Sequence, residues 1–175
     1  ETEPGLYQVS GLQLHYGTPY RLRIETSGGK EYVSAFVSTQ KTPEIDSVTW
    51  SVNQGGVQVA VNTHDPANST RYYKWDYEEV YEYSAYFNSQ FVYRYGEVIT
   101  RPQNESIYRC WRTDASKAIH VGTTVQLSQD VVRNFPLVYH LGNSVQFGRK
   151  YSILVKQYGL SKNEYEYWQM LKKNT

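Results

Sequence analysis

Hydrophobic and polar residues alternate along two neighbouring stretches near the N-terminus. Tyr20, Leu22 and Ile24 alternate with charged side chains, and after the two glycines at 28–29 a similar pattern runs over residues 31–38. Period-two alternation is typical of a half-buried strand, and glycine adopts the positive φ angles that tight turns require. The pattern therefore predicts a β-hairpin.

The residues that lead into this hairpin resemble the entry to the penultimate strand of immunoglobulin-like and fibronectin-III sandwiches. In those folds a tyrosine corner bonds back to upstream backbone, and Tyr20 is the candidate. The same spacing of glycine, tyrosine and apolar residues recurs from Gly148 and Tyr151. We interpret residues 1–40 as the C-terminal part of a first sandwich and expect a second corner at Tyr151, although a glycine before an alternating strand also recurs by chance.

A second β-rich domain is predicted over residues 41–175. Residues 40–43 turn polar and end in a proline, which cannot continue a ladder in a central strand, so they read as a linker. Residues 128–133 predict one helical turn. Strands are predicted over residues 45–51, 57–62, 71–84, 106–112, 117–126 and 150–158.

The stretch 71–84 predicts a long strand with an aromatic face. Side chains alternate between the two faces of a strand, and the two sets here are Tyr73, Trp75, Tyr77, Tyr81 and Tyr83 against Lys74, Asp76, Glu78 and Glu82. We expect Trp75 to be the core tryptophan. We also expect Trp111 to be structural, with Cys110 as a small buried neighbour.

An irregular insertion is predicted at about residues 85–105, as a hairpin or an extended loop. It is rich in tyrosine and phenylalanine, and binding residues often lie in such segments. The candidate ligand-binding residues are Tyr86, Phe91, Tyr93 and Tyr95. The alternative is that these rings complete the core of a sandwich rich in aromatics.

The C-terminus predicts one amphipathic helix over about residues 162–173. Ser161 and Glu164 form a capping box, and the apolar residues at helical spacing include Trp168. Trp168 is expected to pack on the sheet that carries Tyr151, so that the helix belongs to the core. The predicted fold is mainly β, with two immunoglobulin- or fibronectin-III-like sandwich units, the second with an insertion and this helix.

Composition narrows the classes of partner. The net charge is +1 with dispersed Lys and Arg, which argues against nucleic-acid binding and against binding to anionic membranes. The 18 tyrosines favour strands and amphipathic contact surfaces. One cysteine cannot form an internal disulfide. The four histidines, at 15, 64, 120 and 140, are scattered, so neither a metal nor another cofactor is predicted.

No enzyme signature is present: the chain has no Gly-rich phosphate loop, no His-Glu-x-x-His and no Gly-x-Ser-x-Gly. Glu78, Glu79 and Glu82 are the only carboxylates that suggest a glycoside hydrolase, which needs two facing carboxyl groups. Glu78 and Glu82 are instead expected on the solvent face of the long strand. The prediction is a protein without catalytic residues.

Several ordered motifs suggest a family. They are Tyr72-Tyr-Lys-Trp75-Asp-Tyr-Glu-Glu79, Cys110-Trp111, Leu127-Ser-Gln-Asp130, Tyr151-Ser-Ile-Leu-Val-Lys-Gln-Tyr158 and Glu164-Tyr-Glu-Tyr-Trp168. Together they resemble the Bacteroidota cell-envelope lipoproteins that share domain of unknown function 4249. The resemblance implies export, an N-terminal lipid anchor at the outer membrane, and genes near TonB-dependent transporters. A lipobox cysteine is lacking, so the chain is expected to be a fragment.

The sequence thus predicts a non-catalytic, lipoprotein-type binding protein of the outer membrane, facing the cell surface or the periplasm. Its expected role is nutrient capture or partnership with a TonB-dependent transporter or another envelope protein. The alternatives are a carbohydrate-binding module that uses the Tyr-rich segment and a glycoside hydrolase. In place of an envelope protein, the ligand would be a glycan or a peptide. A further expectation is O-glycosylation of Ser47, because Asp46-Ser47-Val48 resembles a short acceptor pattern of exported Bacteroidota proteins.

Overall fold

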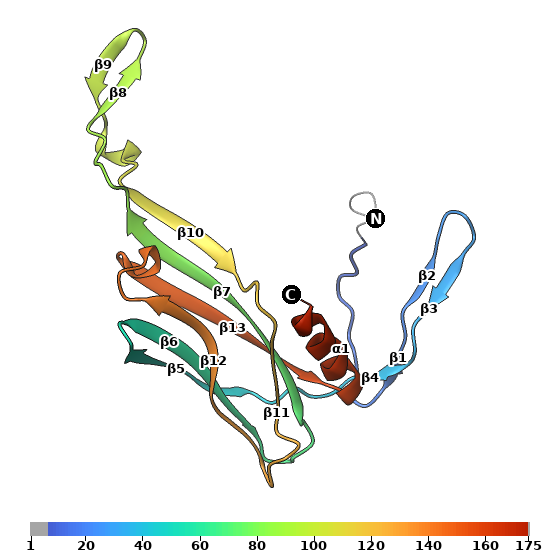
Figure 1. Ribbon diagram of the computed structural model, residues 1–175. Coiled ribbons are helices and arrows are strands. Elements are labelled where there is room, and N and C mark those ends of the chain that lie inside the picture. Colours follow the sequence, from blue (N-terminus) through green and yellow to red (C-terminus); the bar gives the residue numbers. More distant parts are fainter. Residues whose placement is uncertain (1–6, 175) are drawn as a thin grey trace. The chain divides into compact units, whose positions relative to one another are not determined.

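The computed structural model describes residues 7–174 and is mainly β, with one α-helix near the C-terminus (Figure 1). The chain divides into two compact units, residues 1–41 and 42–175. Each unit is described separately below.

The first unit contains the hairpin that the alternation predicts. β2 (Arg23–Glu25) pairs antiparallel with β3 (Glu31–Val33), and β1 (Pro19–Tyr20) pairs with β4 (Val37–Ser38). The predicted hairpin is therefore confirmed. The Tyr20 hydroxyl accepts a hydrogen bond from the backbone N–H of His15 at 3.0 Å, five residues upstream, which is the kind of bond that a tyrosine corner makes.

The second unit contains two antiparallel sheets. In the first sheet, β6 lies between β5 and β12, and in the second sheet β7 is central. β13 pairs with one edge of β7, while β10 and β11 pair with the two halves of the other edge. The bounds are β5 (Ile45–Asn53), β6 (Gly56–Asp65), β7 (Tyr72–Ser84), β10 (Arg109–Ala115), β11 (His120–Thr123), β12 (Asp130–Leu141) and β13 (Lys150–Leu160).

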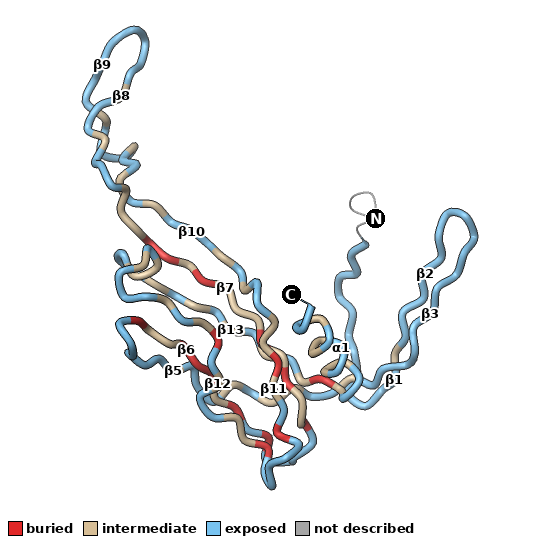
Figure 2. Tube along the Cα trace, viewed as in Figure 1, coloured by how far each residue is buried: buried red, intermediate tan, exposed pale blue. Residues whose placement is uncertain are grey.

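The core lies where the inner faces of these two sheets meet, which Figure 2 shows as buried stretches of β6 and β7. Its buried centre is Val61 and Leu137 from the first sheet and Tyr73 and Trp75 from the second. Phe135 of β12 lies over Trp75 with ring centroids 4.3 Å apart. The Trp75 indole N–H donates to Gln157 of β13 at 2.7 Å, so the largest core ring also has its polar group satisfied.

β12 corrects the sequence-based interpretation, because residues 128–133 form no helical turn and β12 begins at Asp130. Pro136 lies inside the strand, and the register shifts on both sides of it. A proline and irregular pairing are tolerated in an edge strand, and among the described residues β12 pairs only with β6. Asn134, at φ +49°, interrupts the alternation of apolar and polar residues from which a strand would be predicted.

Between β7 and β10 the chain leaves the sheet as a long excursion, residues 85–108, which we call the arm. It contains β8 (Phe91–Arg94), β9 (Glu97–Thr100) and the short 3-10 helix η1 (Gln103–Glu105). β8 and β9 pair as a two-stranded hairpin that projects from the end of β7 (Figure 1). The predicted insertion is therefore a hairpin with an irregular base.

Helix α1 (Lys162–Lys173) begins at the predicted capping box. The Ser161 hydroxyl accepts from the Glu164 N–H, and the Glu164 carboxylate accepts from the Ser161 N–H. The helix packs beside β7, β11 and β13. Trp168 lies over the Lys74 ammonium group, 4.6 Å from the ring centre, and Lys74 also lies over Tyr158.

Trp168 packs on the sheet of β7 and β13, as predicted, but on a different face from Tyr151. Lys74 and Tyr158 project from the outer face of the β7 sheet, whereas Tyr151 belongs to the inner face, where it is the register partner of Tyr81. The helix therefore covers the outer face, and Trp168 is half-buried there and does not enter the core between the sheets. The Lys74 ammonium group, which lies over the Trp168 ring, also forms a salt bridge with Asp76.

Candidate functional site

The arm carries all of the ligand-binding residues that the sequence suggests. The exposed fractions are 92% for Tyr86, 59% for Phe91, 71% for Tyr93 and 101% for Tyr95. The alternative that these rings complete the core is therefore wrong. Tyr95 has φ +52° and forms the turn of the hairpin with Gly96, which explains its complete exposure.

Three exposed apolar side chains share one face of the hairpin. Phe91 and Tyr93 of β8 share it with Val98 of β9, because Tyr93 and Val98 are register partners and side chains two residues apart on a strand point the same way. Val98 is 69% exposed. Tyr86 and Phe87 form an edge-to-face pair where the arm begins. Phe91, Tyr93 and Val98 therefore form an apolar strip on the hairpin, and no described residue covers it.

Polar contacts hold the base of the arm. The Ala85 N–H donates to the Tyr108 carbonyl at 2.8 Å, so the two ends of the excursion lie side by side. Arg94 forms two hydrogen bonds with Glu105, at 2.6 and 3.0 Å. A hollow of about 390 Å³ lies at the base and is lined by Phe91, Arg101 and several amide and hydroxyl side chains, namely Asn88, Ser89, Gln90, Thr100, Gln103 and Ser106.

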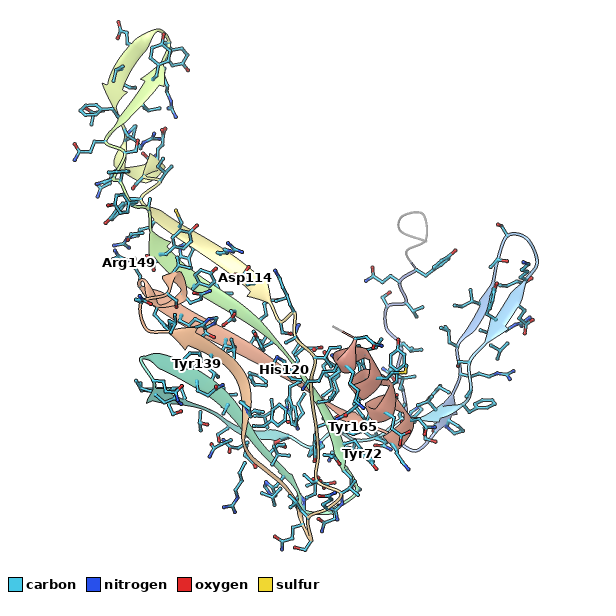
Figure 3. All side chains as sticks on the ribbon, viewed as in Figure 1. Tyr72, Asp114, His120, Tyr139, Arg149 and Tyr165 are labelled. Atoms are coloured by element: carbon cyan, nitrogen blue, oxygen red, sulfur yellow. The ribbon has the colours of Figure 1, made fainter. Side chains whose placement is uncertain are left out.

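A basic cluster lies where the arm joins the sheet. Glu82 of β7 is 2% exposed, and it is ringed by Arg149 at 3.4 Å, Arg109 at 3.7 Å and Lys150 at 4.0 Å. We call these four residues the root cluster; Figure 3 shows Arg149 at this end of the sheet. The expectation that Glu82 is a solvated surface carboxylate is therefore wrong, because three cations replace the water around it.

Trp111 lies beside the root cluster. It is the register partner of Glu82 on β10 and therefore shares the outer face with Glu82 and with Lys150, the partner of Glu82 on β13. Trp111 is 61% exposed, unlike the core residue that a structural role implies. Cys110 is half-buried, with its thiol directed to the Ile107 carbonyl. The outer face here has no packing layer among the described residues, and this accounts for the exposure of Trp111.

The inner face of the same sheet carries a second polar group, centred on Glu79. This carboxylate is 5% exposed and accepts hydrogen bonds from the Tyr151 hydroxyl and from His140 of β12 at 2.6 Å. Burial and the bond to Glu79 raise the pKa of Tyr151 above its ordinary value. The Tyr151 hydroxyl is thus committed to Glu79, which differs from the tyrosine corner expected at this position.

Asp114 of β10 is the register partner of Glu79 and accepts a hydrogen bond from Tyr81 at 2.7 Å. This bond, acting against desolvation and together with Arg112, lowers the pKa of Asp114. Glu78 and Glu79 are adjacent on a strand and project to opposite faces, so they cannot flank one glycosidic bond. On the inner face, the buried carboxylate of Glu79 and the half-buried one of Asp114 instead tie strands and sheets together.

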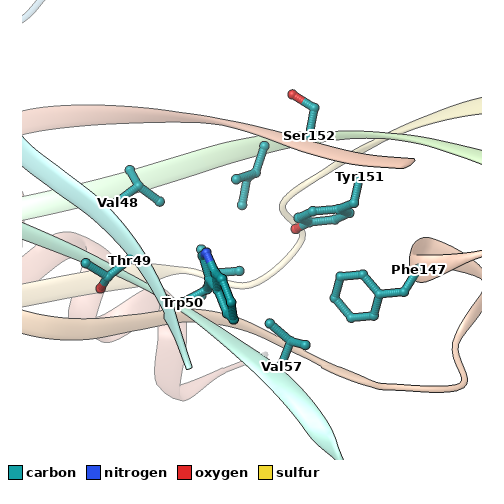
Figure 4. A pocket seen from close by; sticks show the side chains of 9 residues that line it. Val48, Thr49, Trp50, Val57, Phe147, Tyr151 and Ser152 are labelled. Carbon is teal, nitrogen blue, oxygen red and sulfur yellow. The ribbon is translucent and has the colours of Figure 1, made fainter. Parts of the chain in front are cut away.

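A cavity of about 480 Å³ lies between the two sheets at the β5 and β13 edges (Figure 4). Aromatic and aliphatic side chains dominate its walls, which are Val48, Thr49, Trp50, Val57, Val59, Phe147, Tyr151, Ser152 and Ile153. Trp50 is 72% exposed although its register partner, Val59, is 4% exposed. The cavity has the size and lining of a site for an apolar group.

The structure also locates the remaining residues that the sequence singles out. Ser47 is exposed on β5 and accepts a hydrogen bond from Asn62. His64 bonds Asp46 at 2.8 Å, and His120 lies beside Tyr77. Within residues 7–174, no group of three or more His, Cys, Asp or Glu side chains is arranged to hold a metal ion. Over the same residues, no helix has the length and hydropathy needed to cross a bilayer.

Sequence reasoning missed two features of the site. The root cluster joins Glu82 to cations that are far along the chain, and only the strand register brings them together. Glu79 could have been found, because its odd position places it among Tyr77 and Tyr81 on the aromatic face. A carboxylate on a buried face requires hydrogen-bond partners, and Tyr151 and His140 supply them.

Comparison with known proteins identifies the family but supplies no activity. No curated protein and no solved structure matches the chain. The sequence model of one family, described as a domain of unknown function (DUF4249), matches residues 1–175. The chain therefore belongs to the family of this domain of unknown function.

Proposed function

We propose that this chain is a non-catalytic binding protein of the bacterial cell envelope and that it binds a protein partner through the arm. The observation that carries the proposal is the uncovered apolar strip of Phe91, Tyr93 and Val98 on a projecting hairpin. An isolated two-stranded hairpin is only marginally stable in water. A partner that covers the strip would stabilise the hairpin and bury its apolar surface together.

The size and chemistry of the arm support a protein partner. Tyrosine and phenylalanine are enriched in protein interfaces, where a few aromatic anchors carry most of the binding free energy. Each such ring buries about 150–250 Å² when it is covered. The exposed rings of the arm could therefore supply a large share of the roughly 800 Å² that each partner contributes to a standard interface. They are Tyr86, Phe87, Phe91, Tyr93 and Tyr95.

The cellular setting is part of the same proposal and rests on the resemblance to Bacteroidota lipoproteins. The protein is exported, is anchored to the outer membrane as a lipoprotein, and serves nutrient capture. Its partner is a TonB-dependent transporter or another envelope protein. We also interpret the two units as immunoglobulin-like sandwiches. The two facing sheets of the second unit and the bond from His15 to Tyr20 support this interpretation.

The test is co-purification of the native partner from a detergent-solubilised Bacteroidota envelope, with the double variant Phe91→Ala, Tyr93→Ala beside the wild-type chain. We expect the wild-type protein to retain a TonB-dependent transporter or other outer-membrane protein, and the double variant to lose it. The matched control is Tyr16→Ala, because Tyr16 is 70% exposed and Tyr93 is 71% exposed. Equal recovery by all three proteins would refute the arm as the binding surface.

A second candidate, carbohydrate recognition, is favoured by the hollow at the base of the arm. Its wall combines the Phe91 ring, the Arg101 guanidinium and amides, which suits a sugar that stacks and forms hydrogen bonds. This candidate predicts specific hits on a glycan array. Phe91→Ala, which removes the ring of that wall, should weaken them by about 1 kcal/mol. An array without hits would remove the candidate and leave the protein-partner proposal intact.

A further inference from the structure

We infer that the root cluster binds an acidic patch on the protein partner, with Arg109, Arg149 and Lys150 as the contacts and Trp111 as the flat surface beside them. The inference rests on the proposed function, because it describes the part of the interface where the arm joins the sheet. It predicts that the partner surface is negatively charged at this point, whereas the apolar strip of the arm predicts nothing about the partner's charge.

The three cations converge from separate elements onto the start of the arm. Arg109 is the first residue of β10 and pairs with Ser84, the last residue of β7. Arg149 donates from Nη1 to the Ser84 hydroxyl at 3.2 Å. Lys150 is the first residue of β13 and the register partner of Glu82. The cluster is therefore continuous with the arm, which begins at residue 85.

The cluster has an excess of positive charge. Three cations surround the single carboxylate of Glu82, so two positive charges remain after that carboxylate is balanced. The contacts of 3.4–4.0 Å are long for charge-assisted hydrogen bonds. Arg109 and Lys150 also keep 66% and 75% of their side chains exposed. Both side chains can therefore bind a second carboxylate that belongs to a partner.

Glu82 gives the cluster a defined position. A buried carboxylate needs paired charges, since an unpaired one costs several kcal/mol. Glu82 at 2% exposure therefore gathers the three cations around one point of the sheet. The carboxylate sets where the positive charges lie, and it also offsets one of them.

The charges of the arm itself favour a protein over an anionic membrane. Residues 85–108 contain Arg94 and Arg101 against Glu97 and Glu105, so two positive charges minus two negative charges give zero. Glu97 lies next to the turn of the hairpin, where insertion into lipid would bury it. The positive charge is at the opposite end of the arm from that turn. A protein surface that runs along the arm can contact the apolar strip and the root cluster together.

The experiment measures binding of four probes to the intact chain: an octa-glutamate peptide, an octa-lysine peptide, inorganic phosphate, and vesicles of phosphatidylglycerol and phosphatidylcholine. Titration is followed by Trp fluorescence, with Trp111→Phe to identify the local signal. We expect octa-glutamate to bind, octa-lysine not to bind, and the octa-glutamate affinity to fall as salt rises. Phosphate that binds as tightly as octa-glutamate, or tighter binding to vesicles of phosphatidylglycerol and phosphatidylcholine, would overturn the assignment to an acidic protein surface.

Variants test which residues form the contact. Arg109→Gln and Lys150→Gln should each weaken octa-glutamate binding about two- to fivefold, the range for exposed charge pairs, while Arg109→Lys keeps most of it. Glu82→Gln should strengthen binding, because it removes the internal counter-charge. The control is Lys156→Gln, the same charge change on the same strand and face, away from Glu82. Equal losses in the control and the root variants would overturn the inference.

The two proposals can fail independently. Phe91→Ala, Tyr93→Ala should leave octa-glutamate binding unchanged while it abolishes capture of the envelope partner. If that double variant keeps the partner but the root cluster still selects octa-glutamate, the arm proposal fails and an anion-binding site at the root cluster remains. If it loses the partner and octa-glutamate does not bind, the inference about the root cluster fails alone.

Discussion

β7 and the arm are both rich in aromatic residues, and yet these residues meet opposite environments. Tyr73 and Trp75 of β7 are fully buried, whereas Tyr93 and Tyr95 of the arm are 71% and 101% exposed. The inner face of β7 is covered by the sheet of β6 and β12, but the described part of the chain supplies no such layer to the hairpin. Aromatic composition therefore marks surface that must be covered, and only the arrangement of sheets decides whether the chain covers it itself.

The largest loss of stability should come from a substitution on the covered inner face of β7. Trp75→Ala removes the central ring of the core, its contact with Phe135 and its bond to Gln157. We expect a loss of about 3–5 kcal/mol in the free energy of unfolding, which is enough to unfold a marginal domain. Urea denaturation followed by circular dichroism measures it. A loss below about 1 kcal/mol would show that the core does not depend on this ring.

The second effect is a pH dependence of the free energy of unfolding, and it comes from Asp65 at the end of β6. Burial alone would raise the pKa of Asp65, but hydrogen bonds from the Ser69 hydroxyl and from the N–H groups of Thr70, Ala67 and Ser69 outweigh it and lower the pKa to about 2. The unfolded value is 3.8. Since the folded pKa is the lower one, this stabilisation is complete above pH 4 and is lost as the pH falls toward 2.

The shift corresponds to about 2 kcal/mol at neutral pH. Asp65→Asn should therefore be less stable than the wild-type chain at pH 7 and should lose less stability between pH 4 and pH 2. Urea denaturation at a series of pH values measures both. Parallel pH profiles for the two proteins would refute the assignment of this dependence to Asp65.

A smaller loss of stability is expected for the half-buried side chain of Trp168 in α1. Trp168 is half-buried over the ammonium group of Lys74 on the outer face, so Trp168→Ala should lower stability by about 1–2 kcal/mol, less than a core tryptophan. Tyr167→Ala is the control, because Tyr167 is 53% exposed on the same helix. Thermal denaturation of both variants ranks them. A loss as large as that of Trp75→Ala would place Trp168 in the core.

The smallest effect on stability is expected in the arm. Tyr93→Ala should change the free energy of unfolding by less than about 0.5 kcal/mol, as for surface substitutions without a packing role. The measurement is the urea midpoint, with Trp75→Ala as the sensitive comparison. A change of several kcal/mol would mean that Tyr93 packs against its own chain.

Apart from β12, the sequence predicts the strands of the two facing sheets and the helix of the second unit, but not the layers that cover them. Alternation identifies the faces of β7, and Ser161 with Glu164 locates the start of α1, because both signals are local. β12 is not predicted, because Pro136 and Asn134 break its local pattern. Its pairing with β6 forms the strand despite this irregularity.

Contacts across strands also lie beyond a sequence pattern. Trp111 and Lys150 flank Glu82 on the two strands beside β7 through the register of these three strands, and Trp168 covers the outer face because α1 packs over Lys74. The exposure of Tyr93 and Tyr95 follows from the absence of a facing layer among the described residues, which no periodicity reports.

The most direct test of the arm as the recognition surface replaces residues 86–107 with a two-residue Asn-Gly turn. Ala85 and Tyr108 are hydrogen-bonded at 2.8 Å, so the shortened chain can close without moving β7 or β10. Two quantities are measured: the free energy of unfolding and co-purification of the envelope partner. We predict that stability stays within about 1 kcal/mol of the wild-type value, while the partner is lost. A shortened chain that still captures the partner, or one that no longer folds, would contradict the claim.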